Sequence, residues 1–183
     1  MTRLRPAVFL DRDGVINVEV SYLGDPADFQ LLSGVAAALR RLNQAELPVI
    51  VVTNQSGIGR GYFSAAAVAA VHQRMYADLA AAGAHVDGVY LCPHRPDEGC
   101  ACRKPAPGLL KQAARELALD LAQSVVIGDK YTDLAAGHVV GCRTVLVLTG
   151  HGTAELQHGT TLAPDWVAAN LVDAVAWWLA QRH

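Results

Sequence analysis

Short apolar runs recur along the chain, with room for a helix between each pair. They cover residues 7–10, 48–52, 86–91, 124–127 and 143–148. Short runs that are apolar throughout are typical of strands buried on both faces of a sheet. Segments with helical spacing of apolar positions cover residues 34–46, 64–82, 107–118, 132–140 and 171–181. Strands that alternate with helices predict an α/β fold, a Rossmann-like parallel sheet with right-handed crossovers and helices on both faces.

Polar and glycine-containing residues follow three of these strands directly, at 11–14, 53–57 and 128–130. Open α/β sheets bind their ligands at the carboxyl ends of the strands. Asp11 and Asp13 leave the first strand together, and paired carboxylates there indicate cation binding or acid–base chemistry. The same Asp-x-Asp-Gly pattern is also common in turns. The sequence therefore predicts a ligand site at this edge of the sheet, with turn chemistry as the alternative.

The overall composition narrows the class of ligand. The chain has 183 residues, 52% hydrophobic and 17% charged, which predicts one well-packed domain over residues 1–183. The formal net charge is only −2 and the cationic residues are scattered, so nucleic acid and anionic membranes are not expected partners. No run approaches a membrane span and the N-terminus lacks a signal-peptide pattern. We expect a cytoplasmic monomer that acts on a small molecule.

Three of the four cysteines lie close together with a histidine between them. Cys92, His94, Cys100 and Cys102 supply the Cys₃His donor set of a closed, structural zinc site in a loop at 92–102. Clustered cysteines in a reducing compartment indicate metal binding rather than disulfides. Because Arg103 and Lys104 follow Cys102 immediately, a zinc-stabilised loop also fixes two cations near the predicted ligand site. Cys142 stands alone in an apolar setting, which is typical of an inert core residue.

Four segments together resemble the signature motifs of the haloacid dehalogenase superfamily. They are Phe9-Leu-Asp-Arg-Asp-Gly-Val-Ile16, Val52-Thr-Asn54, Arg103-Lys-Pro105 and Gly128-Asp-Lys-Tyr-Thr-Asp133. The motifs appear in the expected order and span about two thirds of the chain. The resemblance implies a magnesium-dependent phosphatase that works through an aspartyl-phosphate intermediate.

The resemblance also implies a role for each motif residue. Asp11 is the expected nucleophile, and Asp13 is the expected acid and base, which protonates the leaving alkoxide and then deprotonates water. Magnesium is expected between Asp11, Asp129 and the backbone carbonyl of Asp13. Thr53 and Lys104 match the family's donors to the phosphoryl oxygens.

Asp133 lies in the first turn of a predicted helix. We expect this carboxylate to cap the helix and to support the site rather than to bind the cation. The glycine-rich run Gly57-Ile-Gly-Arg-Gly61 lacks the Lys-Ser/Thr end of a Walker loop and is interpreted as a flexible edge of the site.

The zinc loop resembles that of two branches of the superfamily, the heptose bisphosphate phosphatases and the histidinol-phosphate phosphatases. The segments 11–17 and 53–61 and the lysine at position 130 resemble the heptose branch. That branch removes the 7-phosphate of D-glycero-D-manno-heptose 1,7-bisphosphate on the route to ADP-heptose and the lipopolysaccharide core. The short zinc loop is closer in length to that of the histidinol branch, so histidinol phosphate stays open as the substrate.

The substrate contacts follow from the same resemblance and from charge. Glu19, Ser21 and Tyr22 resemble the sugar-contacting stretch of the family, with solvated loop positions as the alternative. A bisphosphate needs cations at both ends, and guanidinium groups suit phosphate. The expected contacts to the substrate are therefore Glu19, Ser21, Tyr22, Asn54, Gln55, Ser56, Arg60, Arg103 and Lys130. The intervals from Asp13 to Thr53 and from Thr53 to Lys104 are too short for a large cap domain.

Two other classes of protein were weighed against the phosphatase. A zinc-organised binding module on a dead phosphatase scaffold would lack Asp11, Asp13 or Asp129, and all three are present. A nucleic-acid 3′-phosphatase would need a basic groove or an aromatic platform, and aromatic residues are only 6% of the chain. The remaining histidines have no ligand-like spacing and are expected on the surface or satisfied in the core; they are His72, His85, His138, His151, His158 and His183.

Overall fold

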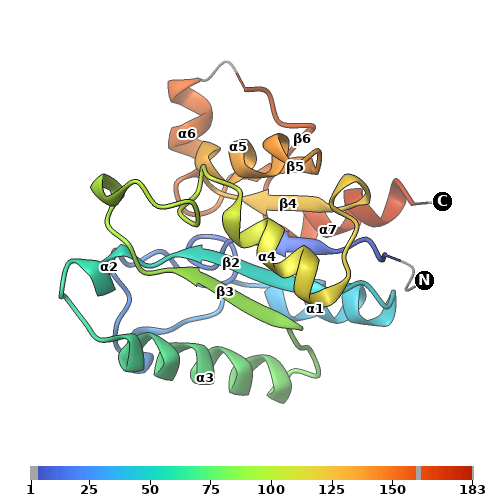
Figure 1. Cartoon of the computed structure of the whole chain (residues 1–183). Helices are drawn as coiled ribbons and strands as arrows, with labels where there is room; N and C mark the ends of the chain where they lie inside the picture. The colour runs from blue at the N-terminus through green and yellow to red at the C-terminus, as the bar shows by residue number, and fades with distance from the viewer. Residues whose placement is uncertain (1–3, 160–161, 183) are drawn as a thin grey trace.

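A single six-stranded parallel sheet forms the centre of the molecule (Figure 1). The computed structural model describes residues 4–159 and 162–182. The strand order is β3-β2-β1-β4-β5-β6. The strands are β1 (Val8–Leu10), β2 (Val49–Asn54), β3 (Gly88–Cys92), β4 (Val125–Gly128), β5 (Arg143–Val147) and β6 (Trp166–Ala168).

Helices connect the strands. They are α1 (Val35–Gln44), α2 (Ser56–Gly59), α3 (Ala65–Ala81), α4 (Gly108–Leu117), α5 (Tyr131–Val139), α6 (Gly152–His158) and α7 (Leu171–Ala180), with short 3₁₀ helices η1 (Pro26–Asp28), η2 (Pro96–Glu98) and η3 (Leu121–Gln123). Side-chain caps begin two of the long helices: Ser64 Oγ accepts from the third backbone N–H of α3, and Asn170 Oδ1 does the same for α7.

Alternate residues of each strand feed two separate hydrophobic clusters, one on each face of the sheet. Val8 and Leu10 of β1 pack into the cluster that includes α1, α3 and α7. Phe9, between them, packs into the cluster that includes α4 and α5. Cys92, the last residue of β3, belongs to this second cluster. The period of two along a strand therefore places helices on both faces, as the sequence predicts.

The five predicted strands and five predicted long helices are all confirmed, with ends shifted by a few residues. The sequence analysis missed β6, α2 and α6. β6 has only three residues, and Trp166 in it is 46% exposed, so no buried apolar run marks this edge strand. α2 and α6 have four and seven residues, too few for a helical period to be visible.

The absence of a large cap domain is also confirmed. Between Asp13 and Thr53 the chain forms only η1, α1 and the first part of β2, and between Thr53 and Lys104 it forms only α2, α3, β3 and η2. In residues 4–159 and 162–182, no helix combines the length and apolar character that crossing a membrane requires.

The order of the strands creates a crevice beside β1. From β1 the chain moves outward through β2 and β3, and then it returns to the other side of β1 for β4 and moves outward through β5 and β6. The connections that leave the carboxyl ends of β1 and β4 therefore diverge. This switch point is where open α/β sheets bind ligands, and Asp11 and Asp129 follow the two strands there.

Candidate active site

A cavity of about 370 Å³ lies at the carboxyl ends of β1, β2 and β4. Most of the predicted site residues line it: Asp11, Asp13, Glu19, Ser21, Tyr22, Thr53, Asn54, Gln55, Ser56, Arg103, Lys104 and Lys130. Thr132, Asp133 and His151 also line it. Arg60 does not; it is exposed at the end of α2. The fold therefore brings together all but one of the predicted substrate contacts.

Lys104 pairs with two carboxylates at the floor of the cavity. Its Nζ lies 3.0 Å from Asp11 Oδ1 and 2.6 Å from Asp133 Oδ1, and it donates to the backbone oxygen of Val52 at 2.7 Å. Burial would lower the pKa of Lys104, but Asp11 and Asp133 outweigh it and raise the pKa above its usual value. The ammonium therefore stays charged although the residue is only 4% exposed.

Asp11 is presented to the cavity by the end of β1. Its Oδ1 accepts from Lys104 Nζ and from the backbone N–H of Arg12, at 2.8 Å, while its Oδ2 takes part in neither contact. Burial raises the pKa of Asp11 to about 6, with Lys104 opposing the rise and Asp133 and Asp13 adding to it. A carboxylate fixed through one oxygen and free of these contacts at the other is suited to nucleophilic attack.

Asp129 is completely buried beside this pair. Its Oδ2 accepts from the backbone N–H of His151 at 2.8 Å, whereas Oδ1 has no hydrogen-bond partner in the described residues. Burial, followed by the nearby Asp11 and Asp133, raises the pKa of Asp129 to about 8. A side chain at Gly14, which has φ of +80°, would collide with Asp129 Oδ2, so glycine is required there.

These carboxylates fit a hard divalent cation. Oxygens of Asp11, Asp129 and Asp133 all lie within 4.8 Å of one another. A cation between Asp11 and Asp129 would give Asp129 Oδ1, which has no partner among the described residues, a ligand. It would also stabilise the ionised carboxylates, which burial and the neighbouring negative charges disfavour. Asp133 is already committed, because Oδ1 pairs with Lys104 and Oδ2 accepts from the backbone N–H of Lys130. It caps α5, as the sequence predicts.

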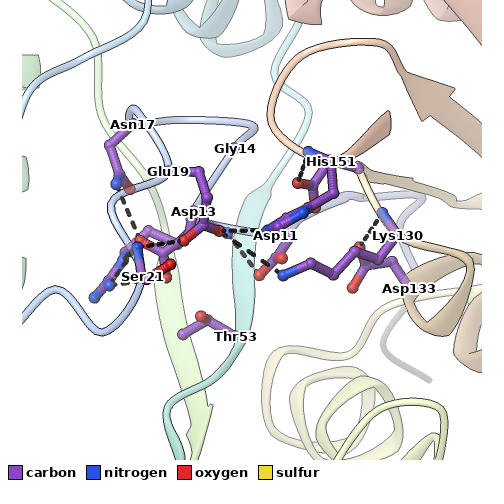
Figure 2. Close-up of polar contacts among 12 residues, drawn as sticks. Asp11, Asp13, Gly14, Asn17, Glu19, Ser21, Thr53, Lys130, Asp133 and His151 are labelled. Carbon is purple, nitrogen blue, oxygen red and sulfur yellow. Dashed lines mark hydrogen bonds and ion pairs between the residues drawn. The ribbon is translucent and has the colours of Figure 1, made fainter. Parts of the chain in front are cut away.

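Asp13 sits in the opposite electrostatic environment. Its two oxygens accept from Arg12 Nε and Nη2 at 2.8–3.2 Å, from Asn17 Nδ2 at 3.0 Å and from Gln55 Nε2 at 2.9 Å. Burial would raise the pKa of Asp13, but Arg12 and these amides lower it below its usual value. Figure 2 shows Asn17 on the Asp13 side of the site and Lys130, Asp133 and His151 on the Asp11 side. The sequence analysis did not single out Arg12, whose side chain is fully buried.

Residues at the carboxyl end of β2 hold the neighbouring motifs in place. Gln55 Nε2 donates to Thr53 Oγ1 at 2.8 Å as well as to Asp13. The amide of Asn54 makes two bonds to the backbone of Lys104, one from Nδ2 to the carbonyl and one to Oδ1 from the N–H, each 3.1 Å long. Asn54 therefore positions the segment that carries Lys104.

Glu19 lies between Lys130 and His151 at the mouth of the cavity. Its Oε2 is 3.8 Å from Lys130 Nζ and 3.5 Å from His151 Nε2, and its Oε1 accepts from the backbone N–H of Ser21. Ser21 and Tyr22 both have positive φ, at 45° and 62°. The sequence analysis assigned His151 no role, although it follows β5 in a Thr149-Gly-His-Gly152 segment, at the same edge of the sheet as the other motifs.

The predicted zinc ligands converge at the end of β3. The donor atoms of Cys92, His94, Cys100 and Cys102 all lie within 4.8 Å of one another, and the three sulfurs are 3.2–3.5 Å apart. Donors placed tetrahedrally about 2.3 Å from a zinc ion would be roughly 3.8 Å apart, slightly farther than the sulfurs are in this structure. Arg103 Nη1 donates to the backbone oxygen of His94 at 3.3 Å. This bond connects the guanidinium of Arg103, which lines the cavity, to the Cys₃His cluster.

The other histidines are placed as follows. His72 is buried on α3, beside the side chain of Arg12. His85, His138 and His158 are exposed, and His183 lies outside the described residues. Cys142 is buried in the cluster under α4 and α5, as expected for a core residue.

Comparison with known proteins identifies the family. Residues 101–174 match a family model described as HAD-hydrolase-like. A D-glycero-D-manno-heptose-1,7-bisphosphate 7-phosphatase from Thermosynechococcus vestitus is 46% identical, over 94% of this chain and 95% of its own length. The chain belongs to this family of heptose bisphosphate phosphatases. Another member, the D-glycero-beta-D-manno-heptose-1,7-bisphosphate 7-phosphatase of Bordetella bronchiseptica, is 43% identical over 83% of this chain and 86% of its own length.

Solved structures of heptose bisphosphate phosphatases share the fold. The D,D-heptose 1,7-bisphosphate phosphatase from B. bronchiseptica, complexed with magnesium and phosphate, matches with a TM-score of 0.91 and 39% identity, over 96% of this chain and 99% of that chain. The enzyme from Burkholderia thailandensis matches with a TM-score of 0.77 and 36% identity, over 96% and 99% of the two chains. The resemblance drawn from the four motifs is confirmed.

The buried carboxylates predict how stability depends on pH. The pKa values of Asp11 and Asp129, about 6 and about 8 in the folded protein, exceed the usual value of 3.8. Groups with a raised folded pKa stabilise the protein at low pH, and this stability is lost as pH rises from about 4 to about 8. Without added Mg²⁺, we expect the free energy of unfolding to fall by on the order of 2 kcal/mol between about pH 6 and pH 8.

Chemical denaturation in the absence and presence of Mg²⁺ measures this dependence. Mg²⁺ should restore stability most at the higher pH, because the ionised carboxylates bind it. The matched control is Asp129→Asn, which removes the group with the higher pKa and should flatten the pH dependence. An equally steep dependence in this variant would contradict the assignment.

Proposed function

We propose that this protein is a magnesium-dependent phosphatase that removes the 7-phosphate of D-glycero-D-manno-heptose 1,7-bisphosphate. The observation that carries the proposal is the pairing of Asp11 with Lys104 on the cavity floor, beside an Asp129 oxygen without a partner. Relatives that share 43–46% of their residues with this chain are named for this reaction. A route to ADP-heptose and the lipopolysaccharide core follows from that substrate.

The first half of the reaction uses the free oxygen of Asp11. It attacks phosphorus, the bond from phosphorus to the sugar oxygen breaks, and the alkoxide takes a proton from Asp13. Lys104 and Thr53 donate toward the phosphoryl oxygens, where charge accumulates. Asp11, Asp129 and the backbone carbonyl of Asp13 would hold Mg²⁺, which when bound offsets the repulsion between carboxylate and phosphate.

The second half of the reaction regenerates Asp11. Asp13 takes a proton from a water molecule, whose oxygen attacks phosphorus as the bond to Asp11 breaks. Inorganic phosphate leaves, and the proton on Asp13 is the one that the next alkoxide requires. The contacts of Asp13 in this structure, all from N–H donors, support the carboxylate form that begins this half.

The phosphate that is not cleaved is assigned to Arg103 and Lys130. Both line the cavity, whereas Arg60 does not. A guanidinium and an ammonium at the rim supply charge for a second phosphate away from Asp11. Glu19, held between Lys130 and His151, is placed to accept hydrogen bonds from sugar hydroxyls.

The Cys₃His cluster is proposed to bind structural zinc. Its four donors leave no position for a reacting water, and the bond from Arg103 to the His94 carbonyl transmits the loop geometry to the cavity. Three thiols that must stay reduced also favour a cytoplasmic location. The protein is proposed to act as a monomer on a small molecule, without nucleic acid.

Substrate competition tests the proposed reaction. We expect magnesium-dependent phosphate release with a kcat/KM at least about 100-fold higher for heptose 1,7-bisphosphate than for histidinol phosphate, because a substrate with one phosphate leaves the second set of cations unpaired. The two are compared side by side by phosphate detection. A preference for histidinol phosphate would favour the alternative function, with the same chemistry at Asp11.

Replacement of the nucleophile tests the covalent step. Asp11→Asn should reduce kcat by at least about 10⁴-fold, since an amide cannot form the phosphoenzyme, while circular dichroism should show an intact fold. Turnover near the wild-type rate would exclude the mechanism.

Metal analysis tests the second site. Cys100→Ser should lose its equivalent of zinc, lower the melting temperature and raise KM for the bisphosphate, because Arg103 loses its fixed position. Cys142→Ser is the matched control, a cysteine outside the cluster, and should keep zinc. If Cys100→Ser retained one equivalent of zinc, the ligand set would be wrong.

A further inference from the structure

The side chain of Arg12 lies between two motifs and is fully buried. Its Nε and Nη2 donate to Asp13, and its Nη1 lies 3.1 Å from Nε2 of His72 on α3. No solvent reaches these donors, so each must be satisfied by a protein group or left unpaired at a cost. His72 is therefore the partner of the guanidinium nitrogen that does not contact Asp13.

The chemistry of the two groups fixes the direction of this hydrogen bond. A guanidinium has five N–H donors and no acceptor, and it does not lose its proton in proteins. Nε2 of His72 must consequently accept, which requires a neutral imidazole with its proton on Nδ1. The surroundings support this state, because burial, followed by the charge of Arg12, lowers the pKa of His72 to about 4 against the opposing effect of Asp13.

This contact extends the set of residues that orient Asp13 to a helix outside the motifs. Asn17 and Gln55 also donate to the carboxylate, but only Arg12 donates through two nitrogens. With His72 in place, rotation of the guanidinium away from Asp13 would break contacts at both of its ends. Without it, Nη1 would become an unpaired buried donor and would favour other orientations of Arg12.

We propose that His72 is a positioning residue for the second half of the reaction, which holds Asp13 through Arg12 in the orientation that takes a proton from the attacking water. The inference rests on the proposed aspartyl-phosphate mechanism. In that step the oxygen of water bonds to phosphorus, its proton passes to Asp13, and the bond from phosphorus to Asp11 breaks with its electron pair returning to the carboxylate.

The N–H groups of Arg12 stabilise the carboxylate form of Asp13, which is the form that begins the second half of the reaction. Loss of His72 should therefore slow hydrolysis of the phosphoenzyme more than its formation. For His72→Leu we expect kcat to fall by about 10- to 100-fold, since misplaced acid–base groups lose rate of this order. Rapid quench with heptose 1,7-bisphosphate labelled at the 7-phosphate should then show acid-stable label accumulating on the protein. His72→Gln, whose amide oxygen can accept from Nη1, should recover most of the rate.

The controls distinguish a positioning role of His72 from an effect on folding and from a failure of the proposed aspartyl-phosphate mechanism. His85→Gln replaces an exposed histidine and should leave all rates unchanged. A wild-type kcat in His72→Leu, a loss of rate without accumulated label, or no recovery in a folded His72→Gln would each overturn the proposal. If the wild-type enzyme itself formed no labelled protein, and Asp11→Asn stayed active, the proposed mechanism would fail instead.

A spectroscopic measurement tests the protonation state of His72 in the unmodified protein. Nitrogen-15 chemical shifts of the histidine rings report which ring nitrogen carries the proton, with the His72 signals assigned by their absence in His72→Gln. We expect Nε2 of His72 to be unprotonated at neutral pH. A protonated Nε2 would overturn the proposal, because it cannot accept from Arg12.

Discussion

Repulsion between buried carboxylates is the constraint around which this site is built. Asp11, Asp129 and Asp133 lie close together at the ends of β1 and β4, and Lys104 pairs with two of them but carries only one positive charge. Burial, with the nearby carboxylates adding to it, raises the pKa of Asp129, and one of its oxygens has no partner within the described residues. A cation bound here would offset the negative charge that the fold brings together.

The two aspartates of the first motif, only two positions apart, meet opposite surroundings. Burial raises the pKa of Asp11, with Asp133 and Asp13 adding to the rise, whereas at Asp13 a guanidinium and two amides outweigh burial and lower the pKa. Pairs of carboxyl groups whose environments push their pKa values apart commonly divide nucleophilic and acid–base roles. Here the difference arises from the partners that the chain after β1 reaches. Asp11 faces Lys104 and Asp133, whereas Asp13 is turned toward the buried Arg12.

Much of the fold and site follows from the sequence because apolar runs mark buried strands and polar residues mark their ends. Asp11, Asp13 and Thr53 were predicted in this way. The zinc donors were predicted from the clustering of cysteines, and Glu19 and its neighbours from the family resemblance. Three kinds of feature were not visible. β6 lacks a buried run, His151 reaches the cavity only through the packing of a loop after β5, and the pairing of Arg12 with His72 links residues whose proximity depends on how α3 packs. Arg60 is the opposite case: it was predicted to contact the substrate because of its charge, but α2 does not bring it to the cavity.

The pairing of β1 with β4 has a consequence for how the protein folds. The backbone N–H of Ala7 donates to Ser124, which lies 117 residues later in the chain, and β1 aligns with β4 at Val8 and Val125. Contacts this distant in sequence form slowly, because a long loop must close before they can be made. Asp11 is brought beside Asp129 only when this long-range pairing has formed. Assembly of the catalytic carboxylates therefore belongs to the slow, non-local part of folding, after local helices can form.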